Sequence, residues 1–416
     1  MFARTATVAT LLTLVASSAF AQTPRPLTGR YVGGAGERPA TLTEAGTRTG
    51  NLGFEPYSAS YLPRSSGPLA NSASDAEIKK MVTDGFGDCN LVHQIIKDNA
   101  NKDTAAKFDA SGATGFRERY LREGYDKDAE SWTGFCHNWA PAGLDASVNF
   151  MVSMDRIYAD IPFGISDMRE ITTFILPNTT GNAWFGKRHN DKDTAEKEED
   201  NLDPVDLLTM LENYVGEGKP GLVLDVDPGY MVWNQPVYKW NRESTLVTGD
   251  AQGPKKAPVG GNAYKVKLTA TYGVEGQYGY RGETLSRDIS WNMYVYTDKN
   301  GKIVDSAWDG SNKIPDFAWS QTGARRDTPE WKALKKIADE GVSVKDIESF
   351  CTTMQGLPAG PISAENAAKL KGLLDKICPV LDQNKLSDYV RATAERTGQD
   401  FSVLEDSIRS GTNAHS

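Results

Sequence analysis

The clearest alternation of apolar and polar positions lies between about Pro204 and Trp319. Four runs there predict β-strands, namely "GLVLDVDPG", "YMVWNQPVYKW", "AYKVKLTATYGV" and "WNMYVYTDKNGKIVDSAW". Within the last run, "DKNG" at residues 298–301 predicts a hairpin turn, because Asn and Gly tolerate the positive φ that such turns need. The preceding "DPVDLLTMLENYVG" has helical spacing, so this region has an α+β pattern.

The C-terminal part of the chain changes to helical spacing after "DTPEW". Thr328 is placed to cap a helix with Pro329 in its first turn, and Trp331, Leu334 and Ile337 recur on one face. Further helical segments follow. We therefore predict a helical C-terminal domain over residues 323–416.

The N-terminal part shows neither the alternation of a strand nor the spacing of a helix. Residues 22–74 are rich in Pro, Gly, Ser and Thr, which predicts a loop-rich pro-segment or linker that makes no core. Helical spacing begins near Asp75, so we expect a folded core over residues 75–322.

The first residues have the pattern of an export signal. Met1 and Arg4 precede an apolar run, and small residues at Ala19 and Ala21 predict cleavage before Gln22, which leaves residues 1–21 as a signal peptide. No later stretch approaches about 18 apolar residues, so no membrane anchor is expected. The sequence therefore predicts a secreted or periplasmic protein, in surroundings that favour disulfides.

Composition narrows the class of protein further. The chain has 416 residues, of which 39% are hydrophobic and 24% charged, as in an ordinary folded protein. Its net charge of -9, without a clustered basic face, argues against nucleic acid as a partner.

The four cysteines offer two kinds of chemistry. Cys351 and Cys378 fall on apolar positions of consecutive predicted helices, which predicts a disulfide in an exported protein. Cys136 lies in "GFCHNWAPAG", where Pro141 predicts that a helix begins at or just after the cysteine. A helix N-terminus stabilises a thiolate, so Cys136 is a candidate nucleophile. Because four cysteines can form two bridges, the alternative is a disulfide between Cys136 and Cys89.

Aromatic and amide side chains surround this candidate. Trp132 and Trp139 could form walls of a cleft, and Trp233 lies beside the amides of Asn234 and Gln235. Those amides could orient a substrate carboxamide or tie down a loop. We predict that all five line a substrate site.

Three segments, "GFCHNWAPAG", "FGKRHNDKD" and "VWNQPV", occur in an order that resembles the secreted transglutaminase elicitor family of oomycetes and marine bacteria. The resemblance covers roughly Gly85 to Trp319. It implies an α+β fold with a papain-like core, in which an antiparallel sheet faces an N-terminal helix that carries Cys136, followed by a C-terminal helical segment.

The resemblance also implies a reaction. A cysteine thiolate, here Cys136, attacks the carboxamide of a protein glutamine, ammonia leaves, and a lysine amine takes the acyl group to form an isopeptide bond. The implied partners are protein substrates with accessible Gln and Lys residues. No cofactor is required by the sequence.

The usual papain-like general base is missing, because residues 221–319 contain no histidine. His137 follows the nucleophile directly and points about 100° away from it in a helix, so it could line the pocket. His189, in the "FGKRHNDKD" segment, could fold back over the cleft. Asp309, in "SAWDGS", lies where a papain-like orienting acid is expected.

Other carboxylates leave alternatives open. Asp225 and Asp227 end the strand "GLVLDVDPG" near "VWNQPV", although Asp before Pro or Gly is ordinary turn chemistry. A calcium ion is possible at Asp98, Asn101 and Asp103, but this segment lacks the glycine and closing glutamate of a recognised loop.

Three functions are therefore open. The first is a secreted protein-glutamine γ-glutamyltransferase. The second is a papain-like cysteine protease, in which water accepts the acyl group. The third is a non-catalytic homologue that acts as a binding or elicitor protein, which the absent strand histidine favours.

Overall fold

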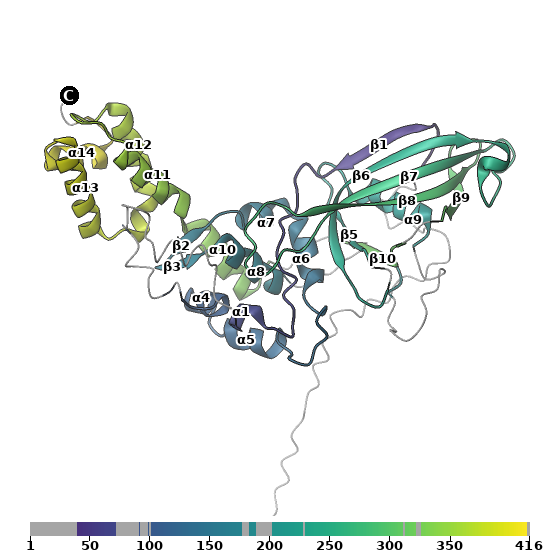
Figure 1. Ribbon diagram of the computed structural model, residues 1–416, viewed down its shortest axis with the longest axis horizontal. Helices are drawn as coiled ribbons and strands as arrows, with labels where there is room; N and C mark the ends of the chain where they lie inside the picture. Colours follow the sequence, from purple (N-terminus) through teal and green to yellow (C-terminus); the bar gives the residue numbers. More distant parts are fainter. Residues whose placement is uncertain are drawn as a thin grey trace, which may run out of the picture.

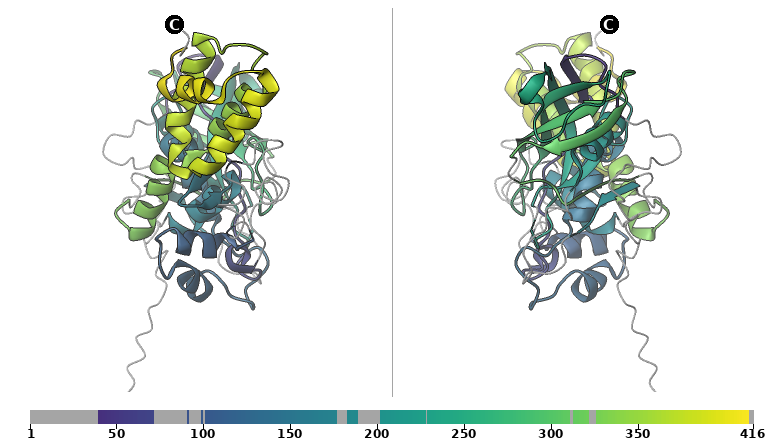
Figure 2. Two further views of the ribbon diagram at one scale, coloured as in Figure 1. Left: turned by 90° about the vertical axis from the view of Figure 1, so that its left-hand side faces the viewer. Right: turned by 90° about the vertical axis from the view of Figure 1, so that its right-hand side faces the viewer.

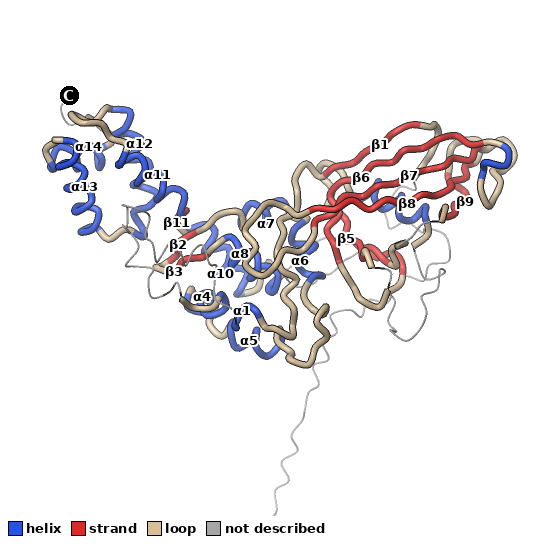
Figure 3. Tube along the Cα trace, viewed as in Figure 1, coloured by secondary structure: helices blue, strands red, loops and turns tan. Residues whose placement is uncertain are grey.

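The computed structural model describes residues 40–71, 91, 99, 101–176, 183–188, 202–227, 229–310, 313–321 and 326–413. The molecule is elongated, with long strands at one end and the C-terminal helices at the other (Figure 1). Views along the long axis place these two parts in front in turn (Figure 2). Between them lies a group of shorter helices, so the helical and strand-rich regions are separated along the molecule (Figure 3).

The helices of the central group are α1 (Pro68–Asn71), α4 (Thr104–Ala110), α5 (Phe116–Glu123), α6 (Cys136–Gly143), α7 (Ala146–Met151), α8 (Ile165–Ile175) and α10 (Pro329–Glu340). Helix α9 (Pro204–Tyr214) lies against the strand-rich end. The C-terminal helices are α11 (Val344–Gln355), α12 (Ala364–Ile377), α13 (Gln383–Thr397) and α14 (Phe401–Ser410). Two short 3-10 turns complete them, η2 (Gly249–Gln252) and η3 (Cys378–Val380).

Two antiparallel sheets organise the described strands. The large sheet has the order β4-β10-β5-β6-β7-β8-β9, with β1 paired to β6 off this path, and the small sheet has the order β11-β2-β3. The strands are β1 (Gly46–Asn51), β2 (Arg156–Tyr158), β3 (Ile161–Phe163), β4 (Ala183–Gly186), β5 (Leu222–Asp225), β6 (Asn234–Val247), β7 (Asn262–Gly273), β8 (Ser286–Thr297), β9 (Ile303–Trp308), β10 (Phe317–Ser320) and β11 (Val342–Ser343).

The strands form where the alternation predicted them. On β7, Val266, Leu268 and Ala270 are buried while Lys265 and Lys267 are exposed, as expected for a strand with one face on a core. The predicted hairpin joins β8 to β9. Its backbone N–H groups at Asp298 and Gly301 donate to Lys302 and Asp298, and Gly301 has φ +79°.

The predicted α+β class is confirmed. An antiparallel sheet faces α6, which begins at Cys136 and contacts α8 and β6. One hydrophobic core joins the sheet to the central helices. Helices α11 to α14 form a second core together with Leu91, Ile157 of β2 and Val342 of β11.

The prediction that residues 22–74 make no core is wrong over residues 40–71. Leu42, Leu52, Tyr57 and Leu62 are buried in the main core, and β1 pairs with β6. The physical reason is that these apolar residues are spaced irregularly and pack against partners far along the chain. Their contacts therefore left no period in the sequence.

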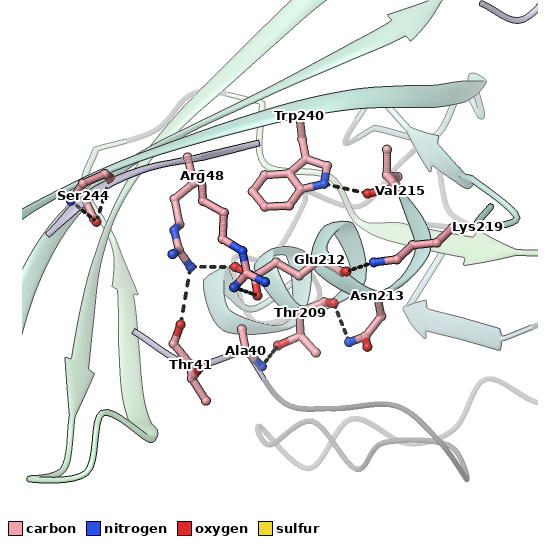
Figure 4. A network of polar contacts seen from close by, with 12 residues as sticks. Ala40, Thr41, Arg48, Thr209, Glu212, Asn213, Val215, Lys219, Trp240 and Ser244 are labelled. Atoms are coloured by element: carbon pink, nitrogen blue, oxygen red, sulfur yellow. Dashed lines mark hydrogen bonds and ion pairs between the residues drawn. The ribbon is translucent and has the colours of Figure 1, made fainter. Parts of the chain in front are cut away.

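A polar network holds this segment against α9 (Figure 4). Glu212 accepts hydrogen bonds from Arg48 at 3.2 Å and from Arg242 at 2.6 Å. The side chains of Glu212 and Arg242 are each only 8% exposed, whereas that of Arg48 is 55% exposed. Nearby, Ala40 N–H donates to Thr209 Oγ1 at 3.2 Å.

The boundary of the C-terminal domain differs from the prediction at residue 323. Trp331, Leu334 and Ile337 of α10 lie in the main core, as does α10 Ala338. The second core begins with Val342 of β11. The apolar face of α10 was predicted, but its packing against the main core was not. Helical spacing shows that a face is buried, but it does not show which surface covers that face.

The predicted bridge between Cys351 and Cys378 is wrong, because Cys378 is an exposed free thiol. Cys378 lies in η3 after α12, whereas Cys351 is buried on α11. Both residues were read as members of apolar faces, but only Cys351 is.

Within the described residues, no helix has the length and apolar character to cross a membrane. The predicted signal peptide, residues 1–21, lies outside the described residues.

Candidate active site

Cys136 is the first residue of α6, and its side chain is buried with 6% of the residue exposed. It is a free thiol, so the alternative bridge to Cys89 is wrong. The chain makes a tight turn just before it. Phe135 N–H donates to the carbonyl of Tyr61 at 2.6 Å, and a Cβ on Gly134 would lie 2.4 Å from the same oxygen. Only glycine fits there, and it lets the helix begin at the cysteine.

The interior of α6 corrects two predictions. Pro141 lies inside the helix and not in its first turn, where its missing N–H costs one helical hydrogen bond. Trp139 is fully buried and its Nε1 donates to the carbonyl of Tyr57 at 3.0 Å. Trp139 therefore anchors the helix in the core and does not line a substrate site.

The sulfur of Cys136 contacts the start of β6. Its thiol donates to the carbonyl of Val232 at 3.7 Å, and Asn234 Nδ2 lies 3.6 Å from Sγ. The other end of the amide is fixed, because Asn234 Oδ1 accepts a hydrogen bond from Trp319 Nε1 at 2.8 Å. This bond sets which amide atom faces the sulfur. The structure thus places Asn234, a predicted substrate-site residue, beside the sulfur of Cys136.

Strand topology explains why this position is available. Trp233 directs its backbone N–H and carbonyl towards β5, since they bond to Asp225 Oδ1 and Val226. The backbone groups of Val232 and Asn234 therefore point to the opposite edge, where β7 would continue. The β6–β7 ladder reaches its end at Val237 and Tyr272, and Cys136 occupies the edge beyond it.

Asp225 holds the loop that covers the sulfur. The residue is fully buried, and its Oδ1 accepts backbone N–H groups from Trp233 at 2.8 Å and Asp227 at 3.2 Å. Burial raises the pKa of Asp225 well above its usual range, and the neighbouring carboxylate of Asp316 raises it further. Asp225 thus acts as the loop anchor that its position before a turn suggested.

A second carboxyl group near the sulfur was missed by the sequence analysis. Glu275 lies two residues after β7, and its Oε2 accepts a hydrogen bond from Gln235 Nε2 at 2.7 Å. Burial is the main cause that raises its pKa. The available signal was an acid directly after the apolar run "AYKVKLTATYGV".

Two aromatic pairs flank the covering loop. Trp233 packs edge-to-face on Tyr61 with ring centroids 5.4 Å apart, and Trp132 packs in the same way on Tyr230 at 5.4 Å. Trp132 also donates from Nε1 to Glu130 at 2.8 Å. The predicted tryptophans at 132 and 233 are thus each packed against a tyrosine, Tyr230 and Tyr61 respectively.

The electrostatics favour a neutral thiol in this conformation. Burial raises the pKa of Cys136 to about 12, and the charges of Glu275 and Asp225 add to the rise. The N–H groups of Asn234 act in the opposite direction but do not overcome it. A thiolate at Cys136 would therefore require a change in the solvation of this site.

His137 is a poor base for this thiol. Burial lowers its pKa to about 4, and the cations Arg188 and Arg64 lower it further. Its ring lies beside Phe135, with centroids 5.9 Å apart. It is therefore neutral near pH 7, and it is the second residue of α6.

Asp309 is not near the site, so its predicted role is wrong. Its carboxylate pairs with Lys265 at 2.8 Å, and it follows β9, which is separated from β6 by two strands. Followed strand by strand, the registers place Asp309 at the level of Glu243, nine residues along β6 from Asn234. At 3.3 Å per residue that is roughly 30 Å. The prediction assumed that a papain-like strand order applies to such long strands.

Two further predictions concern the candidate base His189 and the possible calcium ligands at Asp98, Asn101 and Asp103. His189 lies outside the described residues. Asp103 caps α4 by accepting from Ala106 N–H and pairs with Arg117 at 3.1 Å, and Asp98 lies outside the described part. The described residues contain no group of three or more His, Cys, Asp or Glu side chains placed to hold a metal ion.

The fold and the site together have the arrangement predicted for a papain-like core, a free cysteine that opens a helix against an antiparallel sheet. Comparison with known families confirms the resemblance that the motifs carried. Residues 92–258 match the Transglutaminase elicitor family, a stretch that includes Cys136 and the start of β6. No curated protein matches the chain.

Among solved structures, the crystal structure of the GP42 transglutaminase from Phytophthora sojae is similar to this chain. The two are 17% identical, the match covers 73% of this chain and 94% of that chain, and the TM-score is 0.48.

Proposed function

We propose that the protein is a protein-glutamine γ-glutamyltransferase that uses Cys136 as its nucleophile. The observation that carries the proposal is the free thiol at the start of α6, with the amide of Asn234 held beside its sulfur by Trp319. The family matched over residues 92–258 supports this reaction type.

The first half-reaction acylates the cysteine. The sulfur of Cys136 attacks the carboxamide carbon of a glutamine side chain, and the oxygen of that group becomes negative in the tetrahedral intermediate. Two kinds of donor lie close to where that oxygen forms, the amides at the start of α6 and Asn234 Nδ2. The carbon–nitrogen bond then breaks, ammonia leaves with the added proton, and a thioester remains.

Thiolate formation requires a change at the covering loop. In the structure the thiol donates to Val232 and has its pKa raised to about 12. A glutamine side chain that displaces the Val232 carbonyl would leave the sulfur facing N–H donors, which stabilise the thiolate. The predicted proton acceptor His189 remains part of this proposal.

In the second half-reaction a lysine amine attacks the thioester carbon, and the carbon–sulfur bond breaks to regenerate Cys136. A thioester is reactive enough for an amine to intercept it. The burial of the sulfur, at 6% exposure, restricts competition by water. The expected partners are therefore secreted proteins with accessible Gln and Lys side chains.

Amine incorporation tests the proposal. The wild-type protein, given a glutamine peptide with a blocked amino terminus and a fluorescent primary amine, should form the coupled product. Cys136→Ala should abolish it, and Cys378→Ala is the matched control, because that thiol is exposed and lies on the separate helical core. Activity that survives Cys136→Ala would remove the mechanism.

A second candidate function is binding without catalysis. The neutral, covered thiol favours it, since a pKa of about 12 leaves almost no thiolate near pH 7. If neither coupling nor peptide cleavage occurs with any glutamine peptide, the loop surface around Trp233 becomes the functional element. Cleavage that exceeds coupling would instead favour the protease reaction.

A further inference from the structure

Beside the cysteine lies a pair of side chains that presents only hydrogen-bond acceptors. Gln235, which is 3% exposed, donates its Nε2 to Glu275 Oε2 at 2.7 Å. That bond uses the amide nitrogen and one carboxylate oxygen. Gln235 Oε1 and Glu275 Oε1 are both buried and have no hydrogen-bond partner among the described residues.

Two buried acceptors on one hydrogen-bonded pair of side chains are unfavourable unless a donor group meets them. Neither oxygen can satisfy the other, because the amide oxygen and an ionised carboxylate both accept only. A ligand that brings several N–H donors and a positive charge removes the penalty at both atoms. A primary ammonium, as on a lysine side chain, has three donors and no acceptor, and it is a compact charged group.

The position of the pair matches the second half-reaction. The last β6–β7 partners are Val237 and Tyr272, and continuation of that antiparallel register would set Glu275 opposite Asn234. Asn234 is the residue whose amide contacts Cys136. The charge of Glu275 acts on the thiol of Cys136, which agrees with this placement.

The loop that carries Glu275 is fixed from the other side. Gly276 N–H donates to the carbonyl of Ala59 at 3.0 Å, and Ser58 Oγ donates to the carbonyl of Val274 at 2.8 Å. The backbone is therefore fixed on both sides of Glu275, at Val274 and at Gly276.

We propose that Glu275 and Gln235 form the subsite for the acyl-acceptor amine, and that Glu275 takes the proton this amine loses. The inference rests on the proposed function and adds the recognition of the second substrate. The substrate class is a primary alkylamine, as on a lysine side chain.

The step balances as follows. The amine enters as the ammonium and transfers one proton to Glu275 Oε1. Its nitrogen then attacks the thioester carbon and the carbon–sulfur bond breaks. The second proton lost by nitrogen passes to the departing sulfur of Cys136, and Glu275 releases its proton to solvent. The products are the isopeptide, the thiol and the carboxylate.

Product partition tests the subsite. Wild type, Glu275→Gln and the control Glu283→Gln, an exposed acid in the same loop, receive a blocked glutamine peptide and n-butylamine. The ratio of butylamide to hydrolysed product should fall at least about tenfold in Glu275→Gln, because a charge-assisted bond to the ammonium is lost. Glu283→Gln should keep the wild-type ratio.

Gln at position 275 can still accept from Gln235, so the loop should keep its fold, and a thermal melt checks this. A parallel fall of both products in Glu275→Gln, or an unchanged ratio, would overturn the assignment.

A binding measurement separates this inference from the proposed function. Calorimetry of n-butylamine with the full-length Cys136→Ala protein should show binding that weakens at least about tenfold on adding Glu275→Gln. Binding that depends on Glu275 in a protein whose wild type forms no product would refute the transferase and keep the amine site. Equal affinity of the two variants would refute the amine site.

Discussion

At the scale of single residues, the site depends on a short chain of contacts that runs from Trp319 through Asn234 to Cys136. The indole N–H fixes the amide, and the amide directs its own N–H to the sulfur. In the proposed first half-reaction, an amide in this position serves the oxyanion only if its orientation is set in advance.

We expect Asn234→Ala to lower the rate of amine coupling by about 100-fold, because it removes one donor to the oxyanion. The KM for the glutamine peptide should change much less, since the donor acts mainly in the transition state. Steady-state kinetics measure both quantities. Asn292→Ala, an exposed position on β8, is the control. A loss confined to KM would assign Asn234 to ground-state binding.

The two free thiols should differ in reactivity. Cys136 is covered and its pKa is about 12, whereas Cys378 is exposed, so iodoacetamide at pH 8 should alkylate Cys378 far faster. Peptide mapping by mass spectrometry follows the two sites separately. Saturating glutamine peptide should change the rate at Cys136 alone. Faster alkylation of Cys136 than of Cys378 in the free protein would contradict the covered site described above.

At the scale of elements, the segment 40–71 is as important as the sheet. It supplies β1, the residues that turn the chain into α6, and the backbone that fixes the Glu275 loop. Arg242 of β6 joins this segment to α9, since it donates to the carbonyl of Thr41 and to the buried carboxylate of Glu212.

Glu212→Ala should destabilise the protein by roughly 3 to 5 kcal/mol, because it leaves the buried guanidinium of Arg242 without its carboxylate. Urea unfolding measures the free energy. Asp339→Ala removes an exposed helical pair with Lys335 and should cost at most about 0.5 kcal/mol. Similar losses in the two variants would show that burial does not decide the strength of these pairs.

The sequence predicted the elements whose signal is local. The alternation placed β5 to β9, the helical spacing placed α9 and α10, and Thr328 caps α10 as expected. The packing of segment 40–71 was not predicted, since its partners lie about 190 residues away on β6, as in the pairing of Gly46 with Ser244. Local spacing holds no record of such contacts.

The site divides in the same way. Cys136 and Asn234 were predicted because their flanking residues describe a helix start and an amide after a strand. Trp139 was misassigned, since a buried and a cleft-lining tryptophan look alike in sequence. Glu275 was missed because its proximity to Cys136 depends on where β7 stops relative to β6.

At the scale of the whole molecule, the main core holds buried acids whose pKa values are raised. Glu170 on α8 is 1% exposed, and burial raises its pKa well above the usual range, as it does for Asp225. Such groups bind protons more tightly in the folded than in the unfolded state. Their contribution to stability is fully present below the unfolded pKa, about 4, and is lost as pH rises through the folded pKa.

We therefore expect Glu170→Gln to flatten part of the fall in unfolding free energy between pH 5 and pH 8, because it removes one of these protons. Urea unfolding at several pH values measures the slope. The control is Glu365→Gln, which changes an exposed acid in the first turn of α12. It should leave the slope as in wild type. A steeper fall in Glu170→Gln would show that the carboxyl is ionised in the folded protein.

The central claim is that an acyl group passes through the sulfur of Cys136. The most direct measurement is mass spectrometry of the protein after incubation with a blocked glutamine peptide and no amine, followed by acid quenching and peptide mapping. The account predicts a thioester on the peptide that contains Cys136, removed by hydroxylamine and absent in Cys136→Ala. Amine coupling that proceeds while Cys136 never carries the acyl group would contradict it.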